Sequence, residues 1–210
     1  MRDNTNACVQ AFFESNADLA RVKESVIQAI EAIIGCYLKQ GKILTAGCGG
    51  SMADAEHIAG ELLKRFRIER PLAPDFTARY AALFGEEPPP LDGSLPAVCL
   101  AGNAAIMTAV CNDIGGDYAF AQTALGLTCA GDVLIAISTS GNSRLLIPAM
   151  KVAKAKGAVV VALTGGSGGK MRGLADICIL APAEETYLVQ EQHVRIYHLL
   201  CAAVEEDFYG

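Results

Sequence analysis

A run of hydroxyl side chains follows a short apolar stretch in the middle of this chain. Val133–Ile137 has the composition of a buried strand, and the next six residues, Ser138–Ser143, read STSGNS. A hydroxyl-rich turn between a strand and a helix offers hydrogen-bond donors and the positive end of the helix to an anion. Serine and asparagine are also common helix caps, but a cap does not require four hydroxyls. We therefore expect a phosphate-binding turn here.

The histidines supply a second candidate for chemistry. His57 and Glu61 are four residues apart and share one face of an expected helix. Gln190 and His198 are eight residues apart in the expected last helix, about 80° around an ideal helix, and share a broad face. Taken alone, each histidine, including His193, is better explained as a core residue. Together, the four groups could move a proton next to a carbonyl or hold a metal such as zinc.

Alternating strands and helices must position these groups. The expected strands are Ile43–Ala46, Ala97–Leu100, Asp132–Ile137, Ala158–Leu163 and Ile177–Leu180. The expected helices end near Lys64 and Ala155, span Ala104–Val110, and run from about Glu184 to Glu206. This order predicts an α/β fold, a three-layer sandwich whose central parallel sheet is flanked by helices and binds ligands beyond the strands' carboxyl ends.

Two further segments complete a single domain over residues 1–210, in which residues 41–210 form the α/β core. Apolar residues recur at helical spacing from Ala7 to Gln40, which predicts one long helix or two helices joined near Asn16. We expect this N-terminal segment, residues 1–40, to pack against another subunit. The proline-rich stretch at residues 68–96 predicts a surface excursion without chemistry of its own.

Charge and composition exclude several classes of partner. The net charge of -6 disfavours a nucleic-acid surface, and we interpret the one dense basic run, Lys64–Arg70, as a solvated helix end. No apolar stretch approaches the ~20 residues of a membrane span, so we expect no membrane partner and a cytoplasmic location. The eight cysteines form no C-x-x-C pair, and we expect most to be reduced core residues.

Two glycine-rich turns resemble nucleotide-binding motifs but depart from them. Gly47–Met52 has methionine where a dinucleotide fingerprint has its third glycine. Gly165–Met171 has methionine where a P-loop has its magnesium-binding hydroxyl. We therefore expect no nucleotide cofactor.

The motifs taken together resemble the sugar isomerase (SIS) family, and within it the phosphoheptose isomerase branch. The matching residues are Gly47–Ser51, His57 with Glu61, Cys111–Asp113, Ser138–Ser143, Leu163–Gly165, and Gln190–His193 with His198. The resemblance covers essentially the whole chain. It implies a homotetramer that converts sedoheptulose 7-phosphate to D-glycero-D-manno-heptose 7-phosphate.

The resemblance also implies roles for individual residues. Glu61 would shuttle a proton between C1 and C2 through a cis-enediol, with His198 as the partner acid/base. The residues implied to bind the phosphorylated ketose are Gly50, Ser51, Asn112, Asp113, Ser138, Thr139, Ser140, Ser143 and Gln190. One zinc ion per subunit would be held by His57, Glu61, Gln190 and His198.

This chain departs from the branch in three places. Cys48 stands where an asparagine is usual, Tyr187–Gln190 reads YLVQ in place of DRIQ, and residues 68–96 form a longer link. Two alternatives to an isomerase are a non-catalytic SIS module that binds a replication initiator and a sugar-phosphate-sensing regulator. The presence of His198 favours chemistry over the first, and the lack of a separate DNA-binding domain disfavours the second.

Overall fold

The computed structural model describes all residues, 1–210, and is built around a five-stranded parallel sheet in the order β2-β1-β3-β4-β5. The strands are β1 (Ile43–Gly47), β2 (Ala97–Cys99), β3 (Val133–Ser138), β4 (Val159–Gly165) and β5 (Ile177–Ala181). Every residue of β1 and β3 is buried, which explains why these strands are continuous apolar runs. The predicted fold class and all five predicted strands are confirmed.

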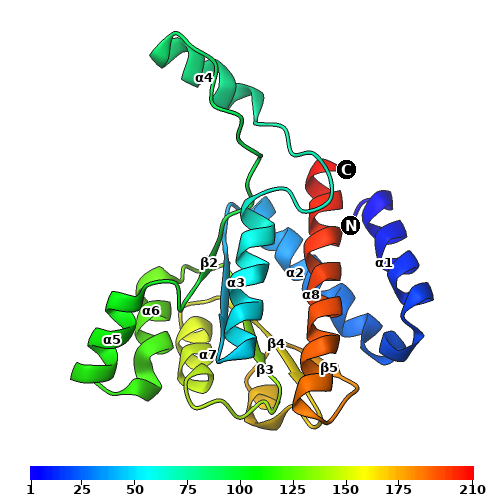
Figure 1. The fold of residues 1–210 in the computed structure, drawn as a ribbon, viewed down its shortest axis with the longest axis vertical. Coiled ribbons are helices and arrows are strands. Elements are labelled where there is room, and N and C mark those ends of the chain that lie inside the picture. Colours follow the sequence, from blue (N-terminus) through cyan, green and yellow to red (C-terminus); the bar gives the residue numbers. More distant parts are fainter.

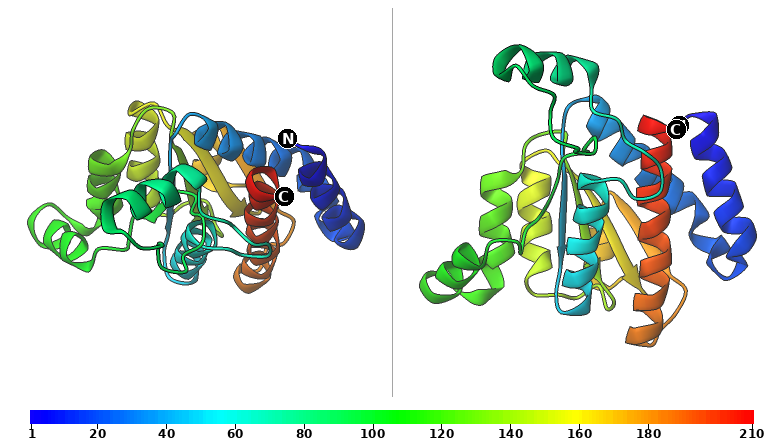
Figure 2. Two further views of the ribbon diagram at one scale, coloured as in Figure 1. Left: turned by 90° about the horizontal axis from the view of Figure 1, so that it is seen from above. Right: turned by 45° about the horizontal axis from the view of Figure 1, so that its top comes forward.

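Helices cover both faces of the sheet, and alternate residues of each strand point to opposite faces. One core joins Ile43, Val133 and Ile135 to helices α1, α2, α3 and α8, and the other joins Leu44 and Leu134 to α6 and α7. The helices are α1 (Asp3–Ser15), α2 (Lys23–Leu38), α3 (Gly50–Leu63), α4 (Pro74–Phe84), α5 (Ala104–Asp113), α6 (Ala119–Leu127), α7 (Leu146–Ala155) and α8 (Thr186–Tyr209). The result is the expected three-layer sandwich, with α3 beside α8 and α5 and α6 at the far side (Figures 1 and 2).

The N-terminal segment forms two helices, as one of the two predictions had it. Helix α1 ends at Ser15, and a 3-10 turn over Ala17–Val22 leads into α2. We expected its apolar stripe to face another subunit, but much of it is covered by its own chain. Val9 and Phe13 of α1 and Ile30 of α2 are buried in the same core as the apolar residues of α8. The stripe therefore completes the core of the sandwich.

The proline-rich stretch is a surface excursion, as predicted, but it contains a helix that the sequence interpretation missed. Helix α4 begins with Pro74, ends before Gly85 at a φ of 72°, and has no buried residue. It stands apart from the sandwich in two views (Figures 1 and 2). Phe76, Tyr80 and Phe84 lie four residues apart and form one aromatic row on it.

The cysteines are all free, as expected, but most are not in the core. Only Cys36 and Cys201 are buried, whereas Cys48, Cys111 and Cys129 are exposed. The expectation of core cysteines is therefore wrong for most of them. No helix of this chain is long and apolar enough to cross a membrane.

Candidate active site

The sheet order reverses between β1 and β3, which are neighbours although β2 follows β1 in the chain. Gly47, the last residue of β1, is paired with Ile137 near the end of β3. The turns that follow both strands therefore leave the same edge of the sheet. Parallel sheets of this type bind ligands in the crevice at such a switch point.

The hydroxyl turn at Ser138–Ser143 is shaped by its own side chains. The amide of Asn142 donates to the Ser140 hydroxyl at 3.3 Å, and the Asn142 side chain accepts from the amide of Lys170 at 3.1 Å. Helix α7 begins only at Leu146, whose amide donates to the Ser143 hydroxyl at 3.4 Å. Helix capping thus explains Ser143 in part, but not the other hydroxyls.

Three hydroxyls at this edge remain available to a ligand. The hydroxyls of Ser51, Ser138 and Thr139 make no hydrogen bond within the chain, although Ser51 and Ser138 lie in buried positions. Unpaired hydroxyls around a helix start suit an oxyanion because each can donate a hydrogen bond. The geometry is therefore that of an anion site.

The glycine turn after β1 lies against the hydroxyl turn. Gly49 has a φ of 59°, which favours glycine, and a side chain at Gly47 would collide with the backbone of Ser51. The sulfur of Cys48 lies 3.4 Å from the hydroxyl oxygen of Ser143. The two turns that the sequence singled out separately therefore form one site.

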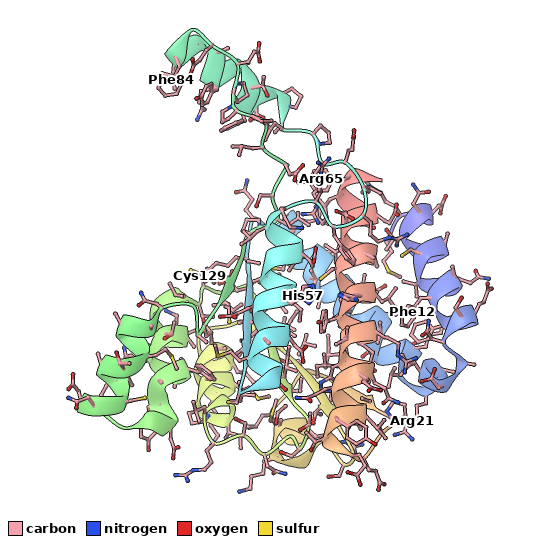
Figure 3. All side chains as sticks on the ribbon, in the orientation of Figure 1. Phe12, Arg21, His57, Arg65, Phe84 and Cys129 are labelled. Carbon is pink, nitrogen blue, oxygen red and sulfur yellow. The ribbon has the colours of Figure 1, made fainter.

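A cluster of ionisable side chains lies further along α3, beside α8, and Figure 3 labels one of them, His57. His57 is hydrogen bonded through Nε2 to Glu61 Oε1 at 3.0 Å and through Nδ1 to the hydroxyl of Tyr197 at 2.9 Å. The ring of His198 lies 5.1 Å from that of His57, centroid to centroid. The predicted grouping of two imidazoles with Glu61 is therefore present in a single chain.

Burial tunes this cluster for proton transfer. Burial, with an added contribution from the positive charge of His57, lowers the pKa of His198 below its ordinary value, and Glu61 opposes this shift. His198 is therefore neutral near pH 7 and can accept or donate a proton. Glu61 Oε2 and His198 Nε2 are both buried and have no hydrogen-bond partner, although Lys64 Nζ lies 3.7 Å from Glu61 Oε2. The unsatisfied His198 Nε2 in particular points to a group that it binds.

The line along which α3 and α8 pack against each other is called the seam here. Gln190 lies at the end of this seam opposite the Glu61 cluster. Its side-chain amide covers Gly50, where a Cβ atom would come within 2.5 Å of Nε2. Gln190 of α8 contacts Gly50 of α3, and Tyr197, seven residues later, contacts His57, also seven residues later. Helices α3 and α8 therefore run parallel. Helical rise places Glu61 about 15 Å beyond Ser51. The seam therefore connects the anion site to the acid/base cluster.

Asn112 and Asp113 lie at the end of α5, and the structure does not bring them to this seam. Both are exposed, and the Asn112 side chain donates only to Asp113, at 2.8 Å. Their implied contact with the sugar therefore has no counterpart within one chain.

The four residues implied to hold zinc do not converge within one chain. His57, Glu61 and His198 are clustered, but Gln190 lies about two helical turns away, at Gly50. No group of three histidine, cysteine, aspartate or glutamate side chains is arranged to hold a metal ion. A single chain thus does not fit the metal, and no chemical step is assigned to one.

The sequence interpretation missed two side chains next to the cluster. Tyr197 is buried and fixes His57, and Asp54 is also buried, with an Oδ2 that has no hydrogen-bond partner. Burial raises the pKa of Asp54, and the nearby Tyr197 hydroxyl and His57 oppose this shift. A usable signal existed for Asp54, since it precedes His57 by one helical turn.

An α/β sandwich with unpaired hydroxyls at its switch point and a glutamate and histidine cluster further along the same helix is the arrangement expected of a sugar-phosphate enzyme of the SIS class. SIS-domain family models match residues 10–88 and 93–203 of this chain. The second match alone covers more than half of the chain.

The relatives narrow the class. The phosphoheptose isomerase of Aneurinibacillus thermoaerophilus is 40% identical over 190 residues, which cover 89% of this chain and 85% of that protein. The solved phosphoheptose isomerase from Neisseria gonorrhoeae is 33% identical with a TM-score of 0.72, over 93% of this chain and 95% of that one. The corresponding structure from Francisella tularensis has 31% identity and a TM-score of 0.75, with the same coverage. The chain belongs to the phosphoheptose isomerase family.

Proposed function

We propose that this protein isomerises D-sedoheptulose 7-phosphate to D-glycero-D-manno-heptose 7-phosphate, in the biosynthesis of heptose for cell-surface glycans. The observation that carries the proposal is the Glu61, His57 and His198 cluster on the seam that begins at the anion site. The family membership supports the same reaction.

The substrate would lie along the seam between α3 and α8 in its open-chain form. Its phosphate accepts hydrogen bonds from Ser51, Ser138, Thr139, Ser140 and Ser143, beside Gly50, which leaves room for the Gln190 amide. Gln190 contacts the sugar chain near the start of the seam, where its amide already lies. The C1 and C2 end then reaches the cluster. An extended molecule suits this arrangement because the two ends of the seam lie apart.

The reaction moves one carbon-bound proton and one hydroxyl proton. Glu61, as a carboxylate, removes a proton from C1 of the ketose and leaves a cis-enediolate, which becomes the enediol when its C2 oxygen is protonated. Neutral His198 accepts the proton of the C1 hydroxyl and returns a proton to the C2 oxygen. Glu61 then delivers its proton to C2, which gives the aldose and restores both residues. His57 holds the carboxylate in place through its hydrogen bond.

Isomer formation is the direct test of this function. Purified protein is incubated with sedoheptulose 7-phosphate, and heptose 7-phosphate is followed by NMR. Formation of the aldose supports the proposal, and the His198→Asn variant should lose turnover. The rival reading is a non-catalytic SIS module. Binding of sedoheptulose 7-phosphate without turnover by the wild type would favour that module.

We further propose that the protein works as a homotetramer in the cytoplasm. A cavity of about 610 Å³ lies between α1 and α8, and His198 and Phe66 form part of its lining. The aromatic row of α4 is also uncovered. Open apolar surfaces of this kind mark contacts between subunits. Light scattering should show four copies, and a monomeric mass with full turnover would contradict the assembly.

Eight free cysteines suit a reducing compartment.

Zinc is a proposal for the assembled protein only. Because Gln190 lies two turns from His198 on α8, a four-ligand site requires donors from more than one copy.

A further inference from the structure

Arg70 and Glu205 form an ion pair that is buried on both sides. Arg70 Nε lies 2.7 Å from Glu205 Oε1, and the side chains are 0% and 1% exposed. In every other ion pair of this chain at least one partner is solvent accessible. Burying two charges is costly unless their remaining hydrogen bonds are satisfied. The other hydrogen-bond partners of Arg70 and Glu205 therefore show which segments of the chain the pair holds together.

Arg70 caps the helix that carries Glu61. Its Nη1 donates to the carbonyl of Leu62 at 2.6 Å, and its Nη2 donates to the carbonyl of Glu61 at 2.8 Å. Helix α3 ends at Leu63, so these carbonyls belong to the last turn and have no donor within the helix, although that of Leu62 also accepts from the amide of Leu95 at 3.0 Å. The basic run was interpreted as a solvated helix end, and that interpretation is wrong for Arg70. It is a buried cap.

Glu205 holds the segment that follows α3. Its carboxylate accepts from the amides of Phe66 at 2.7 Å, Arg67 at 2.8 Å and Ile68 at 3.3 Å. Glu205 lies on α8, two helical turns after His198. The pair therefore ties the end of α3 directly to the helix that carries the other proposed acid/base residue.

We infer that Arg70 and Glu205 are positioning residues that hold Glu61 in place relative to His198. This inference rests on the proposed function. Glu61 and His198 lie on different helices, and the last turn of α3 is fixed to α8 through the Glu61 carbonyl, Arg70 and Glu205. The anion site lies at the opposite end of α3. Loss of the pair should therefore lower kcat and leave KM nearly unchanged, since a displacement of about 1 Å costs on the order of 10²-fold in rate.

The test compares Arg70→Lys and Glu205→Gln with the wild type. Arg70→Lys keeps the charge but lacks the planar fork whose three nitrogens bond both carbonyls and Glu205, and Glu205→Gln keeps an acceptor but loses the charge. We expect kcat to fall at least about tenfold, with KM within about twofold. Arg195→Lys is the matched control, because Arg195 pairs with Asp18 at the surface. It should retain both constants.

A second measurement does not depend on turnover. Hydrogen exchange of the amides from Leu62 to Ile68 should accelerate in both variants and not in Arg195→Lys, because these amides belong to the capped segment. Wild-type kcat in both folded variants, or unchanged exchange, would overturn the inference. If one variant fails to fold, the other decides. An inactive wild type with faster exchange in the variants would refute the proposed function but support the cap.

Discussion

The sulfur atom of Cys48 lies 3.4 Å from the hydroxyl oxygen of Ser143, so the turn after β1 and the turn after β3 meet at a single point. Neither turn alone forms the proposed phosphate site. The contact also places the exposed thiol of Cys48 at the edge of the site. Chemical modification of this thiol therefore reports whether the site is occupied.

Alkylation of Cys48 should therefore block the enzyme. A carboxamidomethyl group added by iodoacetamide would occupy the space next to Ser143. We expect turnover to be lost in step with Cys48 modification, inorganic phosphate to slow the loss, and Cys48→Ser to resist it. Cys111→Ser is the control, because Cys111 is exposed but lies on α5. Full activity after complete Cys48 modification, shown by mass spectrometry, would argue against this site.

Removal of a hydroxyl from the proposed phosphate site should weaken substrate binding. Ser51→Ala and Thr139→Val each delete a hydroxyl that makes no hydrogen bond within the chain, so folding should be little affected. A hydrogen bond to a charged group contributes about 1.5–3 kcal/mol, so KM should rise about tenfold or more. Ser167→Ala should keep the wild-type KM, since the Ser167 hydroxyl serves only its own loop by accepting from Gly169. Unchanged KM in both Ser51→Ala and Thr139→Val would exclude these two hydroxyls from the phosphate site.

His193 should make the fold sensitive to acid. It is fully buried, neither ring nitrogen has a partner, and burial lowers its pKa to about 4. The unfolded state then binds more protons between about pH 4 and the ordinary histidine value of about 6.5. The free energy of unfolding should thus fall as pH falls through this window, by up to about 1.4 kcal/mol per pH unit.

Urea unfolding at pH 7.5 and pH 5.5, at one protein concentration, measures this effect. His193→Leu removes the titrating ring and should show a smaller pH dependence than the wild type. Equal pH dependence in both proteins would show that His193 is not responsible.

Metal content tests the zinc proposal separately from activity. We expect about one zinc per chain in the tetramer, with loss of the metal in Gln190→Ala and His57→Ala. Metal-free tetramer that retains full turnover would reject zinc and leave the acid/base mechanism in place.

The sheet and its two turns could be predicted because their signals are local. Val133–Ile137 is an apolar run followed by hydroxyls, and the segment around Gly47 is a strand followed by glycines. The end of each strand and the turn after it can therefore be located from neighbouring residues in the sequence alone. Helix α4 was missed because its aromatic row is short and flanked by prolines.

The rest of the site depends on tertiary packing, which spacing does not report. His57 and Glu61 share a face by periodicity, but the placement of Gln190 on Gly50 follows from how α8 lies against α3. Arg70 lies in a run of charges that is typical of a solvent-exposed segment, and only the fold reveals its partner, Glu205. Buried polar pairs far apart in sequence leave little local signal.

Solvent-proton exchange tests the central claim most directly, that Glu61 moves the proton between C1 and C2. Sedoheptulose 7-phosphate is incubated with the enzyme in deuterated water and followed by NMR. We expect deuterium at C2 of heptose 7-phosphate for the wild type to the extent that the protonated Glu61 carboxyl exchanges with solvent before it protonates C2, and turnover about 10²–10⁴-fold lower in Glu61→Gln, with that variant still binding the substrate. Turnover by Glu61→Gln at the wild-type rate would contradict this claim.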